Sequence, residues 1–289
     1  MPNATMNGDS AWGGLWSDFA ERADRVTSGA KPRDIVDITI LWQIRGYTCY
    51  VPRPIQAEAL HLPELYSGSP WIAGKPWIAF VTINPSIDPD ELFPDLVQFR
   101  RCRDNLKELV SYFDERFEAT YAATPLPHGR SGGRPTVWRG TIESPAAHHQ
   151  PTWRQIENGL RDCLSKCGRD SGSAILGTVA AIIDAVPWKF AKWACVLDKW
   201  KKELLEFGAP YLRRTLESHP ECPPAAVIAC GLNQDLLPEG HALLSTNDRI
   251  RIGEREVPLL RLSAPTAHGN AFSKEILAKA GEIGKVLAA

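Results

Sequence analysis

The chain has 289 residues, with 33 Lys and Arg against 34 Asp and Glu and a formal net charge of -1. A chain of this length buries a substantial core without disulfides or metals, and its balanced charge argues against a strongly non-specific nucleic-acid binder. No apolar run approaches the roughly 20 residues that a membrane-spanning helix needs, and the first residues lack the basic and apolar regions of a secretory signal. These features predict a globular protein of the cytoplasm with no membrane partner.

Residues 1–74 predict an extension that packs on the rest of the chain. Apolar residues recur at helical spacing over 15–27, and β-branched and aromatic residues dominate the strand-like segment 35–51. The short run at 77–83 (WIAFVTI) is apolar on both faces, which is typical of a central parallel strand. Residues 75–289 are therefore expected to form the main domain.

A helix and a long loop are expected next. Leu and Phe residues at spacings of mostly three, four or seven predict a helix over 91–117, whereas 119–151 is rich in Pro, Gly, His, Arg and Ser and has no period. A stretch of that length without regular structure is usually functional or mobile. The sequence TWRQ at 152–155 matches a capping box, which predicts a helix that begins at Thr152 and ends at Gly168.

The remaining chain alternates strands with helices. Apolar runs predict strands at 174–186, 225–230 and 257–262. The alternation over 248–257 predicts a small hairpin, and helices are expected at 196–217, interrupted at 208–210, and at 272–287. This order predicts an α/β fold: a single-domain three-layer sandwich with helices on both faces of a central, mainly parallel four-stranded sheet.

Seven cysteines at irregular spacing do not form the pattern of a disulfide scaffold. Cys163 and Cys167 are four residues apart on one face of a predicted helix, and no second close pair is near them. A metal or iron–sulfur site needs further ligands, so buried thiols are the favoured interpretation and no metal is expected.

Polar and small residues follow each predicted strand at the edge where α/β sheets bind ligands. The four segments that leave the apolar runs are rich in amides, hydroxyls, prolines and small residues, and they lie at 84–88, 184–190, 231–233 and 263–270. Each segment by itself is typical of a chain turning out of a strand. Four such segments in the same topological position predict a site at the carboxyl edge of the sheet.

These segments resemble the motifs of the uracil-DNA glycosylase superfamily. Residues 82–86 (TINPS) resemble its first motif, G-I-N-P-G in the mismatch-specific branch and G-M-N-P-G in the single-strand-selective branch. Residues 264–267 (APTA) stand where the family has H-P-S-P or N-P-S-G. Between them, 184–189 (DAVPWK) is similar to a segment whose Asn recognises the base, and 225–231 (AAVIACG) is similar to the family's third strand. The resemblance spans residues 75–289 in the right order.

The chain departs from the family pattern in four places. Thr82 replaces a glycine before the first motif, Ser86 follows Pro85, Ala264 replaces the His or Asn of the second motif, and Asp184 replaces the base-recognising Asn. These departures leave open an altered substrate, slow chemistry or lost activity.

The resemblance implies a DNA base glycosylase that flips a damaged or non-canonical base and hydrolyses its bond to deoxyribose without a cofactor. DNA would be its partner, and no obligatory protein partner is evident. Two alternatives stay open on the same fold: a catalytically inactive protein that binds nucleic acid or senses damage, and a hydrolase of free nucleosides or nucleotides.

Three residues are candidates for catalysis. The amide of Asn84 can position a water for attack on the sugar. Asp88 is the carboxylate close enough in sequence to act as an alternative base, although a carboxylate before Pro89 also suits a turn or a helix cap. His268 either fills the gap left by the extruded base or donates to the departing base, and it also suits an exposed loop.

Base recognition is assigned to Asp184, Ile83 and Trp188. The family's Asn offers a donor and an acceptor, which matches uracil, whereas an ionised Asp184 offers only acceptors and suits a guanine-type edge with two adjacent donors. Two alternatives remain: a protonated Asp184 mimics the amide, or Asp184 points away and pairs with Lys189 or an arginine. The backbone N–H groups from Ile83 to Ile87 are further candidate donors.

Nucleic-acid contacts are expected from the loops beyond the strands and from the basic segment 119–151. Thr266 can donate to a phosphate, and Gly269 lets the chain approach DNA closely because it has no Cβ. Basic side chains near tryptophans suit a nucleic-acid backbone and its bases. The residues expected to contact DNA are Ser86, Thr266, Gly269, Lys189, Arg130 and Arg134.

Overall fold

The computed structural model describes residues 66–83, 151–169, 175–186, 198–232, 244, 248–265 and 271–288. The predicted helices at 15–27 and 91–117, the strand-like segment 35–51 and residues 119–150 of the predicted loop lie outside this part of the chain. Within the described ranges, no helix has the length and apolar character that crossing a membrane requires.

The described strands form one mixed sheet of six strands in the order β1-β3-β2-β4-β6-β5. Their bounds are β1 Tyr66–Ser67, β2 Ile78–Thr82, β3 Ala180–Asp184, β4 Ala226–Cys230, β5 Arg249–Ile252 and β6 Arg255–Leu262. β2 pairs in parallel with β3 and β4, and β4 pairs in parallel with β6. β1 and β5 are antiparallel strands at the two edges. The α/β prediction is confirmed. The predicted four-stranded sheet is wrong, because the antiparallel strands β1 and β5 extend the sheet to six strands. Each of the four predicted strands overlaps a strand of the structure, although β3 covers Ala180–Asp184 and not the whole of the predicted 174–186.

The inner strands form because their residues can be buried on both faces of the sheet. Every residue of β2, β3 and β4 is buried, as expected for parallel strands that helices cover on both sides. The edge strand β5 alternates exposed and buried residues. The predicted hairpin is also confirmed, because β5 and β6 are joined by a turn in which Gly253 has a φ of 56°.

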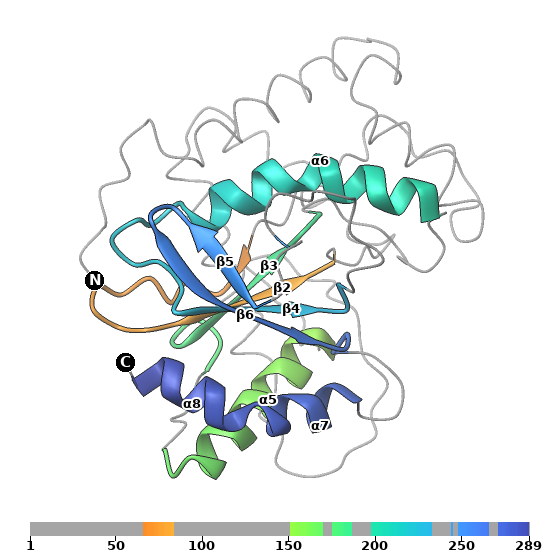
Figure 1. The fold of residues 1–289 in the computed structure, drawn as a ribbon. Coiled ribbons are helices and arrows are strands. Elements are labelled where there is room, and N and C mark those ends of the chain that lie inside the picture. Colours follow the sequence, from red (N-terminus) through yellow and green to blue (C-terminus); the bar gives the residue numbers. More distant parts are fainter. Residues whose placement is uncertain are drawn as a thin grey trace, which may run out of the picture.

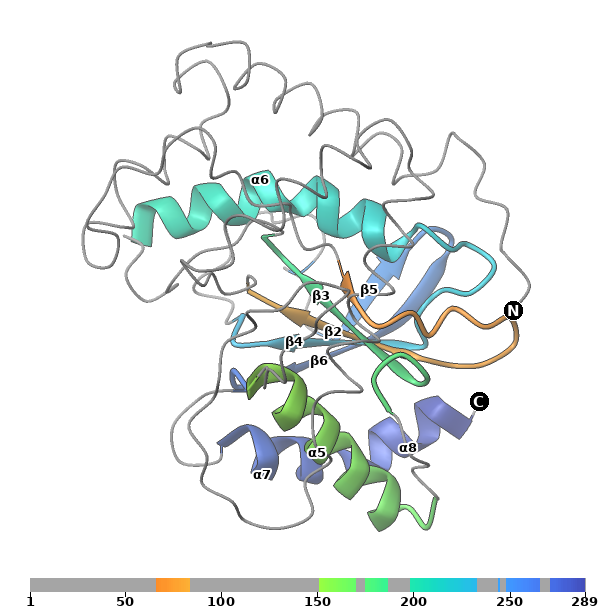
Figure 2. The ribbon, with the colours of Figure 1, turned by 180° about the vertical axis from the view of Figure 1, so that it is seen from behind.

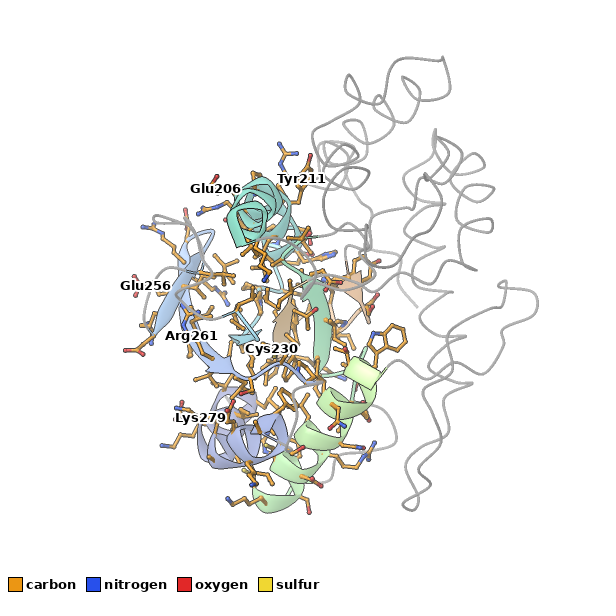
Figure 3. All side chains as sticks on the ribbon, turned by 90° about the vertical axis from the view of Figure 1, so that its right-hand side faces the viewer. Glu206, Tyr211, Cys230, Glu256, Arg261 and Lys279 are labelled. Atoms are coloured by element: carbon orange, nitrogen blue, oxygen red, sulfur yellow. The ribbon has the colours of Figure 1, made fainter. Side chains whose placement is uncertain are left out.

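Helices cover both faces of the sheet (Figures 1 and 2). Their bounds are α5 Pro151–Lys166, α6 Asp198–Leu216, α7 Ala271–Ala278 and α8 Ala280–Ala288. α5, α7 and α8 pack on one face, and α6 lies on the other. Alternate strand residues, Ile78 and Phe80 on β2 and Ile182 on β3, share a buried cluster with α5, α7 and α8. Figure 3 shows side chains filling the space between the sheet and each helical layer.

The predicted end of helix α5 is confirmed, and its predicted start is wrong. It begins at Pro151, so Thr152 is already helical and is not the capping residue. A proline suits the first position of a helix, where an N–H would have no partner within the helix. At the other end, Gly168 has a φ of 69°, its N–H donates to the Ser165 carbonyl at 3.0 Å, and the N–H of Arg169 donates to the Leu164 carbonyl at 2.9 Å. This pair of bonds is a Schellman motif.

The predicted interruption of α6 is wrong, since the helix continues through Gly208 and Pro210. Proline removes one helical hydrogen bond, but packing of the helix on the sheet outweighs that loss.

The closing helix, predicted as one element, is divided into α7 and α8 at Lys279. Side chains of α5 and of Cys167, just beyond its end, bond to carbonyls around this break. Cys163 Sγ donates to Ile276 O at 3.1 Å, Lys166 Nζ to Leu277 O at 3.3 Å and Cys167 Sγ to Ala280 O at 3.3 Å. The buried-thiol prediction is confirmed for Cys163 and wrong for Cys167, which is exposed.

Candidate functional site

The carboxyl ends of β2 and β3 lie side by side, where the sequence predicts a site. Thr82, the last residue of β2, is paired in register with Asp184, the last residue of β3. Two backbone hydrogen bonds continue the pairing beyond the strands: Ala185 N donates to Thr82 O at 2.8 Å, and Val186 N donates to Ile83 O at 2.9 Å. The structure therefore brings Ile83 and Asp184, both predicted to recognise a base, to the same point of the edge.

A buried polar pair occupies this point. The hydroxyl of Thr82 donates a hydrogen bond to Oδ1 of Asp184. The two residues are 8 % and 7 % exposed. They lie on the face of the sheet that α5, α7 and α8 cover, because each follows a residue of that core, Phe80 or Ile182, by two positions along its strand. A carboxylate that is nearly withdrawn from water needs such a donor. Each residue differs from the motif that its segment is expected to resemble, and the structure shows that the two residues are in contact.

The ends of β4 and β6 meet in a similar way. The N–H of Gly231, just beyond β4, donates to the Leu262 carbonyl at 2.8 Å. Gly231 has a φ of 69°, and a Cβ on it would lie 2.9 Å from the Cβ of Ala264. Glycine at this position therefore satisfies both a left-handed backbone and a close approach by the segment that begins the predicted second motif. The methyl group of Ala264 faces this strand end.

Helix α7 holds the same segment through an acidic side chain. The two oxygens of the Glu275 carboxylate accept hydrogen bonds from Ser263, from its backbone N–H at 2.5 Å and from its hydroxyl at 2.7 Å. Glu275 also stands near Cys230, whose thiol pKa is raised, first by burial and then by this negative charge. Sequence reasoning missed Glu275, since no local pattern distinguishes it from other acidic residues of the closing helix.

An arginine of β6 organises the chain beyond β4. Arg261 donates from Nη1 to the Leu232 carbonyl at 3.0 Å and from Nη2 to the Leu244 carbonyl. Burial lowers the pKa of its guanidinium. Arg261 and Cys230 are labelled in Figure 3 on these two strands. The edge of the sheet beside the candidate site is thus held by side chain to backbone bonds as well as by the strand ladder.

Most of the residues predicted to act at the site lie outside the described part of the chain. These are the proposed catalytic residues Asn84, Asp88 and His268, the proposed base-recognition residue Trp188, and the proposed DNA contacts Ser86, Thr266, Gly269, Lys189, Arg130 and Arg134. The described chain stops at Ile83 on the first motif, at Val186 on the central segment and at Pro265 on the second.

The described edge offers a buried carboxylate, a hydroxyl and backbone groups, which can bind the N–H groups of a ligand. Among the residues that the structure describes, no three His, Cys, Asp or Glu side chains stand close enough to hold a metal ion. No protein-family model matches the chain, and no curated protein matches it either.

Proposed function

We propose that this protein is a DNA base glycosylase whose site lies at the carboxyl edge of the sheet. One observation carries the proposal: the chain leaves β2 and β3 at adjacent points, with Thr82 opposite Asp184 and with two further backbone bonds beyond the strands. The segments that resemble the water-positioning and base-recognising motifs of the family therefore begin next to each other. A single site can use both segments.

The arrangement of the parallel strands supports the proposal further. β3, β2, β4 and β6 are neighbours in that order, and each is followed by one of the four polar segments that the resemblance rests on. A single-domain, three-layer fold of the uracil-DNA glycosylase kind, formed by residues 75–289, is part of this proposal.

Breaking the bond between base and sugar develops positive charge on the sugar and negative charge on the base, so the site must position water and stabilise the departing base. In the proposed reaction, Asn84 positions the water after the nucleotide is flipped out of the stack. The water oxygen bonds to the sugar carbon as the bond to the base breaks, and the proton that the water loses passes to the departing base. The carboxylate of Asp184 accepts the ring N–H of the base. No step requires a cofactor, and DNA is bound by the loops beyond the strands together with Arg130, Arg134 and Lys189.

A second candidate function is a protein that binds altered DNA without cleaving the bond. The position of Ala264 favours it, because its methyl group faces Gly231, where the resembling family has a polar His or Asn. A site without that polar group retains surfaces for binding and loses one catalytic contact.

The test uses oligonucleotides that carry one altered base each, with alkaline cleavage of the abasic sites that excision leaves. We expect slow release of uracil by the parent protein, because a carboxylate at residue 184 faces the uracil carbonyl with negative charge. Asp184→Asn restores a donor at nearly constant volume and should accelerate uracil release. Asp248→Asn makes the same chemical change at an exposed position and should have no effect.

Three other outcomes of this assay would distinguish the alternative functions. Fast uracil release that Asp184→Asn leaves unchanged would contradict base recognition by this residue. Binding of altered oligonucleotides without any cleavage would support the second candidate. Release of bases from free nucleosides but not from oligonucleotides would indicate a nucleoside hydrolase.

A further inference from the structure

Thr82 contacts the side chain of Asp184 from a rigid strand. Its backbone is fixed by the parallel pairing of β2 with β3, and its carbonyl accepts the N–H of Ala185 at 2.8 Å. As a β-branched residue it has restricted side-chain rotation, so its hydroxyl has a well-defined place on the rigid strand. That hydroxyl donates to Oδ1 of Asp184, and both residues are buried.

In this hydrogen bond the Thr82 hydroxyl is the donor and Oδ1 of Asp184 is the acceptor. The proposed function takes Asp184 as an ionised carboxylate, which has no hydrogen to donate and so accepts from every partner. Hydrogen bonds to a charged acceptor are stronger and more directional than those between neutral groups. The bond therefore restrains Oδ1 of Asp184 against the rigid strand β2.

We propose that Thr82 is a specificity-determining positioning residue, which acts through Asp184 by presenting that carboxylate to the base as a fixed acceptor. The inference rests on the proposed function and names its substrate class: bases whose edge offers adjacent N–H donors, as a guanine-type edge does, in preference to the uracil edge with its carbonyl. The glycine at this place in the resembling family has no side chain that can make such a bond.

The test compares two substitutions that separate the hydroxyl of Thr82 from its shape. Thr82→Val keeps the shape and removes the hydroxyl, whereas Thr82→Ser keeps the hydroxyl and removes the methyl group. For each variant, single-turnover excision and binding are measured on three oligonucleotides. They carry uracil, hypoxanthine, or an oxidised guanine that keeps its ring N–H and exocyclic amine.

We expect the parent to prefer the oxidised guanine to uracil. Thr82→Val should reduce that preference by about 10- to 100-fold, the effect of losing one hydrogen bond to a charged group. Thr82→Ser should keep it. A purely structural role would lower the rates on all three oligonucleotides together and leave their ratio unchanged, so the ratio is the deciding measurement.

Thr82→Val leaves a buried carboxylate without this donor and can impair folding, so the comparison is repeated in the Asp184→Asn background, where residue 184 is neutral. In that background, Thr82→Val should still change the ratio of the excision rates on the three oligonucleotides, and Thr82→Ser should not. If the Val and Ser variants have the same ratio of rates in both backgrounds, Thr82 has no role in base preference, although the glycosylase proposal still stands. A parent protein that neither binds nor cleaves any of the three oligonucleotides would overturn both.

Discussion

Gly208, in the middle of α6, provides the sharpest test of the packing at the candidate site. Replacing a glycine in a helix interior by alanine ordinarily stabilises the helix by about 1 kcal/mol. Here we expect the opposite. A Cβ on Gly208 would lie 2.0 Å from the carbonyl oxygen of Ala185, 3.1 Å from its carbonyl carbon and 3.2 Å from the Cα of Val186. All three are backbone atoms just beyond β3, so no side-chain rotation can relieve the clash.

The magnitude follows from the size of that overlap. Ordinary contacts of a Cβ begin at 3.4 Å, so α6 and the end of β3 must separate by roughly 1.4 Å in a closely packed interior. Overpacking of this kind costs about 1–3 kcal/mol, and a backbone clash belongs at the upper end. After the gain in helix propensity is subtracted, Gly208→Ala should lower the free energy of unfolding by about 2 kcal/mol and Tm by about 4–8 °C.

The measurement is urea denaturation, in which the midpoint should fall while the slope with denaturant stays the same. Gly281→Ala is the matched control, because Gly281 lies in α8 and a Cβ there has no heavy atom within 4 Å. It should leave stability unchanged or raise it by up to about 1 kcal/mol. A Gly208→Ala protein as stable as the parent would show that α6 does not press on the end of β3.

Three further substitutions or treatments give independent tests. Asn84→Ala should reduce base excision by orders of magnitude in single-turnover assays while DNA affinity stays nearly intact; unchanged activity would redirect attention to other groups. Glu275→Gln leaves one acceptor oxygen for the two donors of Ser263, so we expect a loss of about 1–2 kcal/mol in urea unfolding, and an unaltered midpoint would contradict this contact. Burial raises the pKa of Cys163 to about 11. Its thiolate fraction at pH 8 is therefore about 100-fold below that of an ordinary thiol, and mass spectrometry should find the exposed Cys167 alkylated by iodoacetamide long before Cys163.

Much of the fold could be predicted because its signals are local. The apolar runs at 77–83 and 225–230 contain β2 and β4, since a strand that helices cover on both faces must be apolar throughout. Gly168 marks the end of α5 because a left-handed residue is required there. The same logic places the four polar segments at one edge of the sheet, since parallel strands bring their carboxyl ends together.

Other features depend on contacts between residues far apart in the chain. Local signals at 208–210 predict a break in α6, and packing on the sheet keeps that helix continuous. In α6, packing outweighs the helix propensities of glycine and proline, which are about 1 and 3 kcal/mol less favourable than that of alanine. Local periodicity predicts one closing helix, whereas the structure divides it at Lys279, where donors from α5 and Cys167 bond to its carbonyls.

The candidate site shows the same division. The sequence alone places Thr82 and Asp184 at the ends of two predicted strands, as a hydroxyl and a carboxylate that follow apolar runs. Only the tertiary structure decides that they are partners, since 102 positions separate them and the bond forms when β2 and β3 pair in register. Glu275 has no sequence signal at all and acquires its partner, Ser263, only because α7 folds back against the end of β6. The sequence determines which chemical group a side chain carries, whereas the packing of strands and helices determines which group it contacts.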